Sequence, residues 1–136
     1  MTFYEITKDD LALIDAALAV LQKNFDAGIF YHTVGAAVRT KEGKVYSGVN
    51  CDGIHGSCAE YIALGTAISS GEHDFDTIVA VHDNTPNHLL APCGNCRQMM
   101  MEYCPDIKVI LNDDHDQIIK VSVRDLLPFA WMPVEN

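Results

Sequence analysis

Two short cysteine-bearing segments constrain the fold of this chain more than any other feature of its sequence. The first is "GSCAEY" (56–61) and the second is "APCGNCRQ" (91–98). Each leads into a pattern typical of a helix, so Cys58 opens one helix and the Cys93/Cys96 pair opens another. Cys93 and Cys96 are one turn apart and therefore share one face of their helix. A fold that brings the two helix starts together would gather three thiols in one place.

Three thiols at helix N-termini are suited to binding a metal. The helix dipole and the unpaired amide groups of the first turn lower the pKa of a cysteine placed there. Three converging thiolates make a zinc site with a fourth position open to water, which is typical of catalytic rather than structural zinc. Two alternatives remain. Cys93/Cys96 could be a redox pair, although such pairs usually follow the first strand and this one follows the third, or His55 or Cys51 could complete a structural zinc site.

Glu60, two residues after Cys58, favours catalysis. It is not needed as a ligand, because three sulfurs already suffice, but a carboxylate beside activated water can accept and return a proton. Cys-x-Glu followed later by Pro-Cys-x-x-Cys is the thiolate form of the zinc deaminase signature. The two halves together indicate a catalytic zinc site.

The hydrophobic pattern predicts an α/β fold. Thr7 and Asp10 form a capping box for a first helix that carries Leu11, Ile14, Leu18, Leu21 and Phe25 and ends at Gly28. Further helices are expected over 58–71 and 92–104, with a last helical turn over 123–128, and strands over 33–40, 44–50, 77–82, 107–111 and 118–123. This order predicts a three-layer α/β/α sandwich around a five-stranded mixed sheet, in a single domain over 1–136. The last two strands must be antiparallel, because their connection is too short for a crossover helix.

Charge and composition narrow the partners. The net charge is −10, and the nine Lys and Arg residues are scattered along the chain, which argues against nucleic acid. No basic leader or membrane-length apolar run is present, so we expect neither a signal peptide nor a membrane partner. Five cysteines without a secretory signal suggest the reducing cytoplasm.

Five segments are informative together: "VGAAV" (34–38), "GVN" (48–50), "CAE" (58–60), "PCGNCRQ" (92–98) and "LLP" (126–128). In these segments the chain resembles the cytidine deaminase family, including its small blasticidin S deaminase-like members. The resemblance implies a cytidine deaminase-like fold and zinc held by Cys58, Cys93 and Cys96. Zinc-bound hydroxide would attack C4 of a cytosine ring, with Glu60 shuttling the proton to N3 and then to the departing amine. It further implies a free nucleoside substrate, cytidine or deoxycytidine, and a homotetramer.

The same resemblance implies residues that bind the substrate. The amide of Ala59 and the carbonyl of Ala91 would hold the polar edge of the base, and Asn50 would bind the sugar. Asp52 stands where the family has a longer Glu. His32 occupies the place of an aromatic ring that stacks on the pyrimidine; the alternative is a loop histidine with no ligand role.

For three further residues, two different roles are considered. Arg97 would donate to a zinc-bound sulfur and offset the negative charge of three thiolates; the alternative is a solvated surface arginine. Phe129 and Trp131 would close the pocket, as in blasticidin S deaminase-like proteins, or pack against the core or an oligomer interface. Besides a cytidine deaminase, two functions therefore remain: a blasticidin S-type deaminase and a non-catalytic zinc-binding scaffold.

Overall fold

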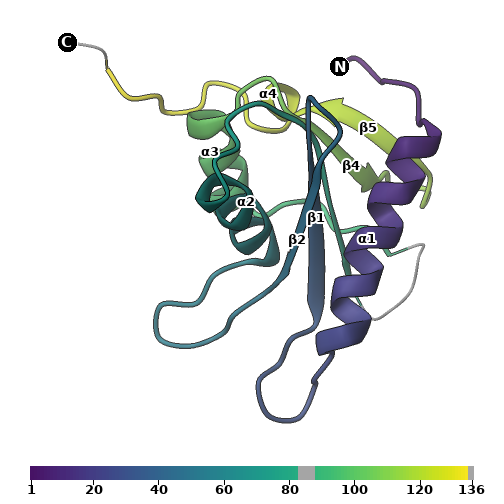
Figure 1. Ribbon diagram of the computed structural model, residues 1–136. Coiled ribbons are helices and arrows are strands. Elements are labelled where there is room, and N and C mark those ends of the chain that lie inside the picture. The colour runs from purple at the N-terminus through teal and green to yellow at the C-terminus, as the bar shows by residue number, and fades with distance from the viewer. Residues whose placement is uncertain (83–87, 135–136) are drawn as a thin grey trace.

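A single mixed sheet forms the centre of the computed structural model, which describes residues 1–82 and 88–134 (Figure 1). Within the described residues the sheet has five strands in the order β2-β1-β3-β4-β5. Only the β3–β4 pair is parallel; β1 is antiparallel to both β2 and β3, and β4 is antiparallel to β5. The predicted mixed sheet and its antiparallel last pair are confirmed. The strands are β1 (Val34–Thr40), β2 (Val45–Val49), β3 (Phe75–His82), β4 (Lys108–Asn112) and β5 (Ile118–Ser122).

Helices cover both faces of this sheet, which gives the expected three layers (Figure 1). One face carries α1 (Lys8–Asn24), and the other carries α2 (Ala59–Ser69) and α3 (Gly94–Tyr103), with the short α4 (Val123–Leu126) after β5. Successive strand residues point to opposite faces of the sheet and so contact different helices. Ala37 and Val79 pack with α1, whereas Ala36 and Ile78 pack with α2 and α3. None of the helices in the described parts of the chain is both long and apolar enough to cross a membrane.

The first helix begins as predicted but ends earlier. Thr7 and Asp10 form the reciprocal capping box. The helix stops at Asn24 rather than near Gly28, because the carboxylate of Asp26 accepts the backbone amides of residues 28–30 and so stabilises a turn instead. Leu11 and Phe25 were wrongly assigned to the apolar face and are 50% and 43% exposed. The buried face is formed by Leu13, Ile14, Ala17, Leu18 and Leu21.

Two glycines let the helices approach the sheet closely. A Cβ atom at Gly48 of β2 would lie 2.6 Å from Ile62 Cγ2 and 2.9 Å from the backbone nitrogen of Ala63, both in α2. A Cβ atom at Gly35 of β1 would lie 2.3 Å from the carbonyl oxygen of Ala17 in α1. Both contacts are too short for any other residue type. The glycine at position 48 therefore sets how deeply α2 sits on the sheet.

Candidate active site

Three cysteine thiols meet where α2 and α3 begin. Cys58 is the N-cap residue of α2, Cys93 is the N-cap residue of α3, and Cys96 lies in the first turn of α3. The sulfur atoms of Cys58 and Cys93 are 3.7 Å apart, and all three sulfurs lie within 4.8 Å of one another. The helices rest on the same face of the sheet, so residues 35 positions apart in the sequence become neighbours. The expected convergence is confirmed.

The spacing of the sulfurs fits a zinc ion. Zinc–sulfur bonds of about 2.3 Å in tetrahedral geometry place the sulfurs about 3.8 Å apart. The Cys58–Cys93 distance of 3.7 Å already matches that value. Among the described residues, no histidine, carboxylate or further cysteine belongs to the cluster, and neither His55 nor Cys51 is close enough to join it. A zinc ion held here would thus have a coordination position that no protein group fills in the described part of the chain.

The protonation preferences of the thiols also favour a cation. Burial raises the pKa of Cys58 and, together with the nearby Glu60 carboxylate, that of Cys96. For Cys93, burial opposes ionisation, but hydrogen bonds from the Cys96 backbone and side chain outweigh it and lower the pKa. Cys93 is therefore the thiol that ionises most easily, and a nearby positive charge, which a divalent metal would supply, would favour the thiolate form of the other two.

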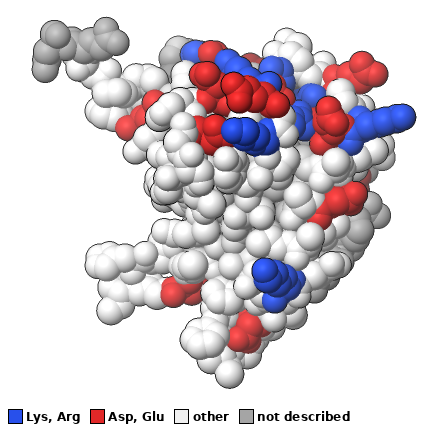
Figure 2. Space-filling model, in the orientation of Figure 1, with Lys and Arg blue, Asp and Glu red and all other residues white. Residues whose placement is uncertain are grey.

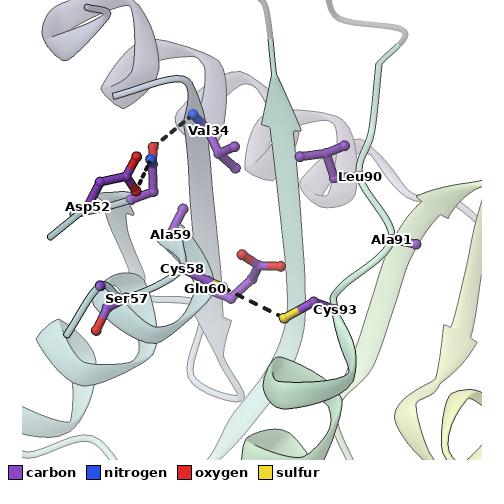
Figure 3. A pocket seen from close by; sticks show the side chains of 11 residues that line it. Val34, Asp52, Ser57, Cys58, Ala59, Glu60, Leu90, Ala91 and Cys93 are labelled. Carbon is purple, nitrogen blue, oxygen red and sulfur yellow. Dashed lines mark hydrogen bonds between the residues drawn. The ribbon is translucent and has the colours of Figure 1, made fainter. Parts of the chain in front are cut away.

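A pocket of about 350 Å³ opens beside the cluster. Figure 3 shows Asp52 across this pocket from Cys93, with Ala59 and Glu60 between them. Seven predicted site residues line it: Asn50, Asp52, Cys58, Ala59, Glu60, Ala91 and Cys93. Four lining residues were not predicted: Val34, Gly56, Ser57 and Leu90. All four adjoin a predicted residue or its motif, since Val34 opens "VGAAV", Gly56 and Ser57 open "GSCAEY" and Leu90 precedes Ala91.

Glu60 is the buried carboxylate of the pocket. It lies in the first turn of α2, is only 6% exposed, and borders the apolar side chains of Ala80, Leu90 and Pro92. Burial raises its pKa. No Lys or Arg is among the lining residues, so no basic side chain of the pocket offsets its charge. A buried carboxylate with a raised pKa beside a metal-binding cluster is typical of a group that transfers protons.

His32 does not line the pocket. Its Nδ1 atom lies 2.7 Å from the carbonyl oxygen of Asn50, and its ring stacks on Phe30 with centroids 6.0 Å apart. The ring is thus engaged with its own loop. In this conformation the structure agrees with the alternative of a loop histidine rather than a ring that stacks on a base.

Arg97 has different partners from those predicted. Its Nε atom donates to the carbonyl of Pro92 and its Nη1 atom to the carbonyl of Leu126, both at 2.8 Å. No hydrogen bond from Arg97 to a sulfur is present among the described residues. For Leu126 the reason is its place at the C-terminal end of α4, where carbonyls lack intrahelical partners and attract a cationic donor. Arg97 thus joins the segment before Cys93 to the end of α4.

The aromatic tail lies outside the pocket. Neither Phe129 nor Trp131 lines it, Phe129 is fully exposed, and the ring of Trp131 is mostly exposed. The backbone there is nevertheless tied down, because Gln98 Nε2 donates to the carbonyl of Trp131 at 2.7 Å. Of the two alternatives for the tail, packing against the core is not seen. An oligomer interface and the expected homotetramer stay predictions.

Sequence comparison with known proteins identifies deaminases as relatives. A family model described as the cytidine and deoxycytidylate deaminase zinc-binding region matches residues 7–112. Blasticidin-S deaminase from Bacillus cereus is 34% identical over 140 residues, covering 96% of this chain and 98% of its own. Cytidine deaminase from Halalkalibacterium halodurans is 41% identical over 102 residues, covering 72% of this chain and 76% of its own.

Solved structures agree with the sequence relatives. The crystal structure of cytidine deaminase from Burkholderia pseudomallei superposes with a TM-score of 0.73 at 36% identity, covering 88% of this chain and 97% of that one. The shared fold confirms the predicted architecture. The family model and the sulfur cluster together support zinc as the metal.

Proposed function

This chain belongs to the family of cytidine and deoxycytidylate deaminases, and from that premise we propose that it hydrolyses the amino group from the cytosine ring of a free nucleoside, cytidine or deoxycytidine. The products would be the corresponding uracil nucleoside and ammonia. One observation carries the proposal: three cysteine sulfurs from two helix starts converge beside a buried carboxylate in a single pocket.

In this proposal the side chains have separate tasks. Cys58, Cys93 and Cys96 would hold zinc, which would supply Lewis-acid activation of a water molecule for attack at C4 of the ring. Glu60 would take one proton of that water and deliver it to N3, and would then transfer the second proton, from the hydroxyl now bonded to C4, to the departing amine. A carboxylate whose pKa is raised by burial is suited to this exchange near neutral pH. The amide of Ala59 and the carbonyl of Ala91, both at the pocket wall, would orient the base.

The charge of the pocket favours a nucleoside over a nucleotide. Asp52 and Glu60 both line it, whereas no Lys or Arg does. A 5′-phosphate would bring two further negative charges with no basic partner among these lining residues. We therefore expect a neutral or cationic small molecule.

A blasticidin S-type deaminase is the second candidate. It is favoured by the similarity to the Bacillus cereus enzyme over nearly the whole chain. A cationic aminoacyl group would also suit a pocket that carries two carboxylates. The exposed Phe129 and Trp131 are the first place to look for such a specificity.

Ammonia release separates these candidates. The purified, zinc-loaded protein would be assayed against cytidine, deoxycytidine, deoxycytidine monophosphate and blasticidin S side by side. Turnover of the two simple nucleosides supports the first proposal, and turnover of blasticidin S alone supports the second. Turnover of the monophosphate at a comparable rate would contradict the charge argument. Release from none of the four would leave a zinc-binding scaffold.

A further inference from the structure

Arg97 connects two segments that are far apart in the sequence. Its Nε atom donates to the carbonyl of Pro92 and its Nη1 atom to the carbonyl of Leu126, both at 2.8 Å. Arg97 is half-buried, and Leu126 packs against the apolar core between the sheet and α2 and α3. The end of α4 thus supports the guanidinium group, which in turn holds the carbonyl of Pro92.

Pro92 lies between two groups that the proposed reaction uses. Ala91 precedes it and offers the carbonyl that would orient the base, and Cys93 follows it and offers a sulfur of the cluster. Figure 3 shows Leu90, Ala91 and Cys93 along one segment at the wall of the pocket. The path of the backbone through Pro92 therefore sets the direction of the Ala91 carbonyl relative to the Cys93 sulfur.

The backbone around Pro92 has few ways to turn. Both peptide units that flank Pro92 are planar, and the proline ring fixes the φ angle of this residue. The ψ angle of Pro92 is then the main free torsion between the carbonyl of Ala91 and the amide of Cys93. Rotation about this angle moves the carbonyl oxygen of Pro92, so the hydrogen bond from Arg97 to that oxygen holds the torsion.

Two backbone hydrogen bonds fix the segment on either side of Pro92. The amide of Leu90 donates to the carbonyl of Ala80 in β3 at 2.8 Å. The amide of Arg97 donates to the carbonyl of Cys93 at 2.9 Å, at the start of α3. Arg97 therefore holds two successive carbonyls, that of Pro92 through its side chain and that of Cys93 through its backbone.

We propose that Arg97 is a positioning residue: by holding the carbonyl of Pro92, it sets the angle between the Ala91 carbonyl, which would orient the base, and the Cys93 sulfur, which would bind the metal. The inference rests on the proposed function. It differs from the prediction that Arg97 donates to a zinc-bound sulfur. Both side-chain bonds go to backbone carbonyls, so the arrangement of the two donors matters more than the charge.

Replacing Arg97 by lysine separates geometry from charge. Lysine keeps the positive charge but gathers its donors on one nitrogen, so it does not reproduce the rigid fork of a guanidinium. With deoxycytidine as substrate, kcat of Arg97→Lys should fall at least about tenfold, because a misplacement of about 1 Å can cost about 10²-fold in rate. KM should change by less than about threefold, since the other walls of the pocket are unaltered.

A spectroscopic measurement reports on the sulfur without any turnover. Cobalt(II) bound in place of zinc gives visible bands that depend on the coordination geometry and charge-transfer bands that depend on the thiolate ligands. In Arg97→Lys the charge-transfer bands should keep their intensity while the visible bands shift, because three sulfurs still bind but one has changed direction. Arg97→Ala should show the same shift.

Arg124→Lys is the matched control. Arg124 lies on α4 and pairs with Asp106 at the surface, at 3.4 Å, with both side chains largely exposed. Its replacement by lysine should leave kcat, KM and the cobalt spectrum as in the parent. Arg97→Lys also keeps the test decisive if Arg97→Ala fails to fold.

The inference is overturned if Arg97→Lys has either the kcat or the cobalt spectrum of the parent, even where its free energy of unfolding is lower. Arg97 would then contribute only stability or charge, and the proposed function would stand. If the parent released no ammonia from any cytosine nucleoside, the proposed function would fall. The cobalt spectrum would in that case still decide whether Arg97 positions Cys93.

Discussion

At the scale of single residues, the chemistry depends on a few groups with unusual surroundings. Glu60 is a buried carboxylate with no basic side chain among the residues that line its pocket. Burying a carboxylate without a basic partner costs free energy of folding, and groups with such surroundings are common at functional sites. The three thiols next to it include two whose pKa is raised by burial. A positive ion at the cluster would stabilise the ionised forms of both the Glu60 carboxylate and these thiols.

Replacing Glu60 by glutamine should separate catalysis from metal binding. Glu60→Gln retains the size and polarity of the side chain but cannot accept a proton, so the turnover number should fall by at least about 10²-fold. Zinc content, measured by elemental analysis, should not change. Glu102→Gln, on the exposed surface of α3, is the matched control and should retain full activity. Substantial turnover by Glu60→Gln would show that another group carries the proton.

Serine substitutions of the cysteines should identify the metal ligands. Cys58→Ser, Cys93→Ser or Cys96→Ser should each lower the zinc affinity by at least about tenfold, because each removes a thiolate ligand. Cys51→Ser and His55→Ala should bind zinc as the parent does, since neither residue belongs to the cluster. Competition with a chelator gives the affinities. Zinc loss in either of the last two variants would support a structural site with four protein ligands.

At the scale of elements, α2 is the part on which the site depends most. It carries Glu60 in its first turn and Cys58 at its N-cap, and it rests on Gly48 of β2. The depth at which α2 docks therefore fixes the positions of Cys58 and Glu60 relative to α3. A small displacement of this helix would change the geometry of the sulfur cluster.

An alanine at Gly48 should disturb stability and zinc binding together. Its methyl group would overlap Ile62 and the backbone of Ala63, so we expect a loss of about 1–3 kcal/mol in the free energy of unfolding and weaker zinc binding. Gly65→Ala is the control, because a Cβ atom there meets nothing within 4 Å and alanine favours the helix by about 0.5–1 kcal/mol. Urea denaturation of both variants gives the comparison. Equal stability of the two would contradict the packing argument.

At the scale of the whole molecule, a buried charge cluster joins α1 to the sheet. Asp10, which also caps α1, is fully buried and pairs with Arg39 of β1 and Lys120 of β5. Arg39 in turn pairs with Asp76 of β3. Figure 2 shows acidic and basic side chains gathered over one end of the molecule, with few around the rest of that face. The cluster ties three strands and a helix together at a distance in sequence of up to 110 residues.

This cluster should make stability sensitive to acid. Burial alone would raise the pKa of Asp10, but hydrogen bonds from Lys120, Thr7 and Arg39 hold it at about 2. In the unfolded chain the pKa of an aspartate is about 3.9. Between that pH and pH 2 the unfolded state therefore binds more protons than the folded state. The stabilisation by the ionised Asp10 is lost as the pH falls toward 2. Asp10→Asn should cost about 3 kcal/mol at pH 6, because Arg39 and Lys120 lose a shared partner.

Denaturation at a series of pH values checks this expectation. The difference in unfolding free energy between the parent and Asp10→Asn should narrow steadily from pH 5 to pH 2. Asp114→Asn, at an exposed turn aspartate, should differ from the parent by no more than about 0.5 kcal/mol throughout. A difference for Asp10→Asn that stayed constant or grew in acid would show that the carboxylate is not held ionised by its partners.

Sequence reasoning succeeded where the signal is local. The capping box of Thr7 and Asp10 and the helices that start at Cys58 and Cys93 each depend on residues within a few positions. It failed at the end of α1, where the side chain of Asp26 competes with the helix for backbone amides. It also missed the hydrogen bond from Arg97 to the carbonyl of Leu126, since that carbonyl lies 29 residues away.

The sequence by itself determined the order of helices and strands, the family, and which three thiols lie together. These follow from periodicity, caps and motif spacing, which are properties of neighbouring residues. Only the tertiary structure decided that, within the described residues, each donor and acceptor of the Asn50 side chain already has a partner and that the ring of His32 is engaged outside the pocket. The physical reason is that a hydrogen-bonding group has a fixed capacity, and the partners that fill it come from distant segments whose approach depends on how the helices pack on the sheet.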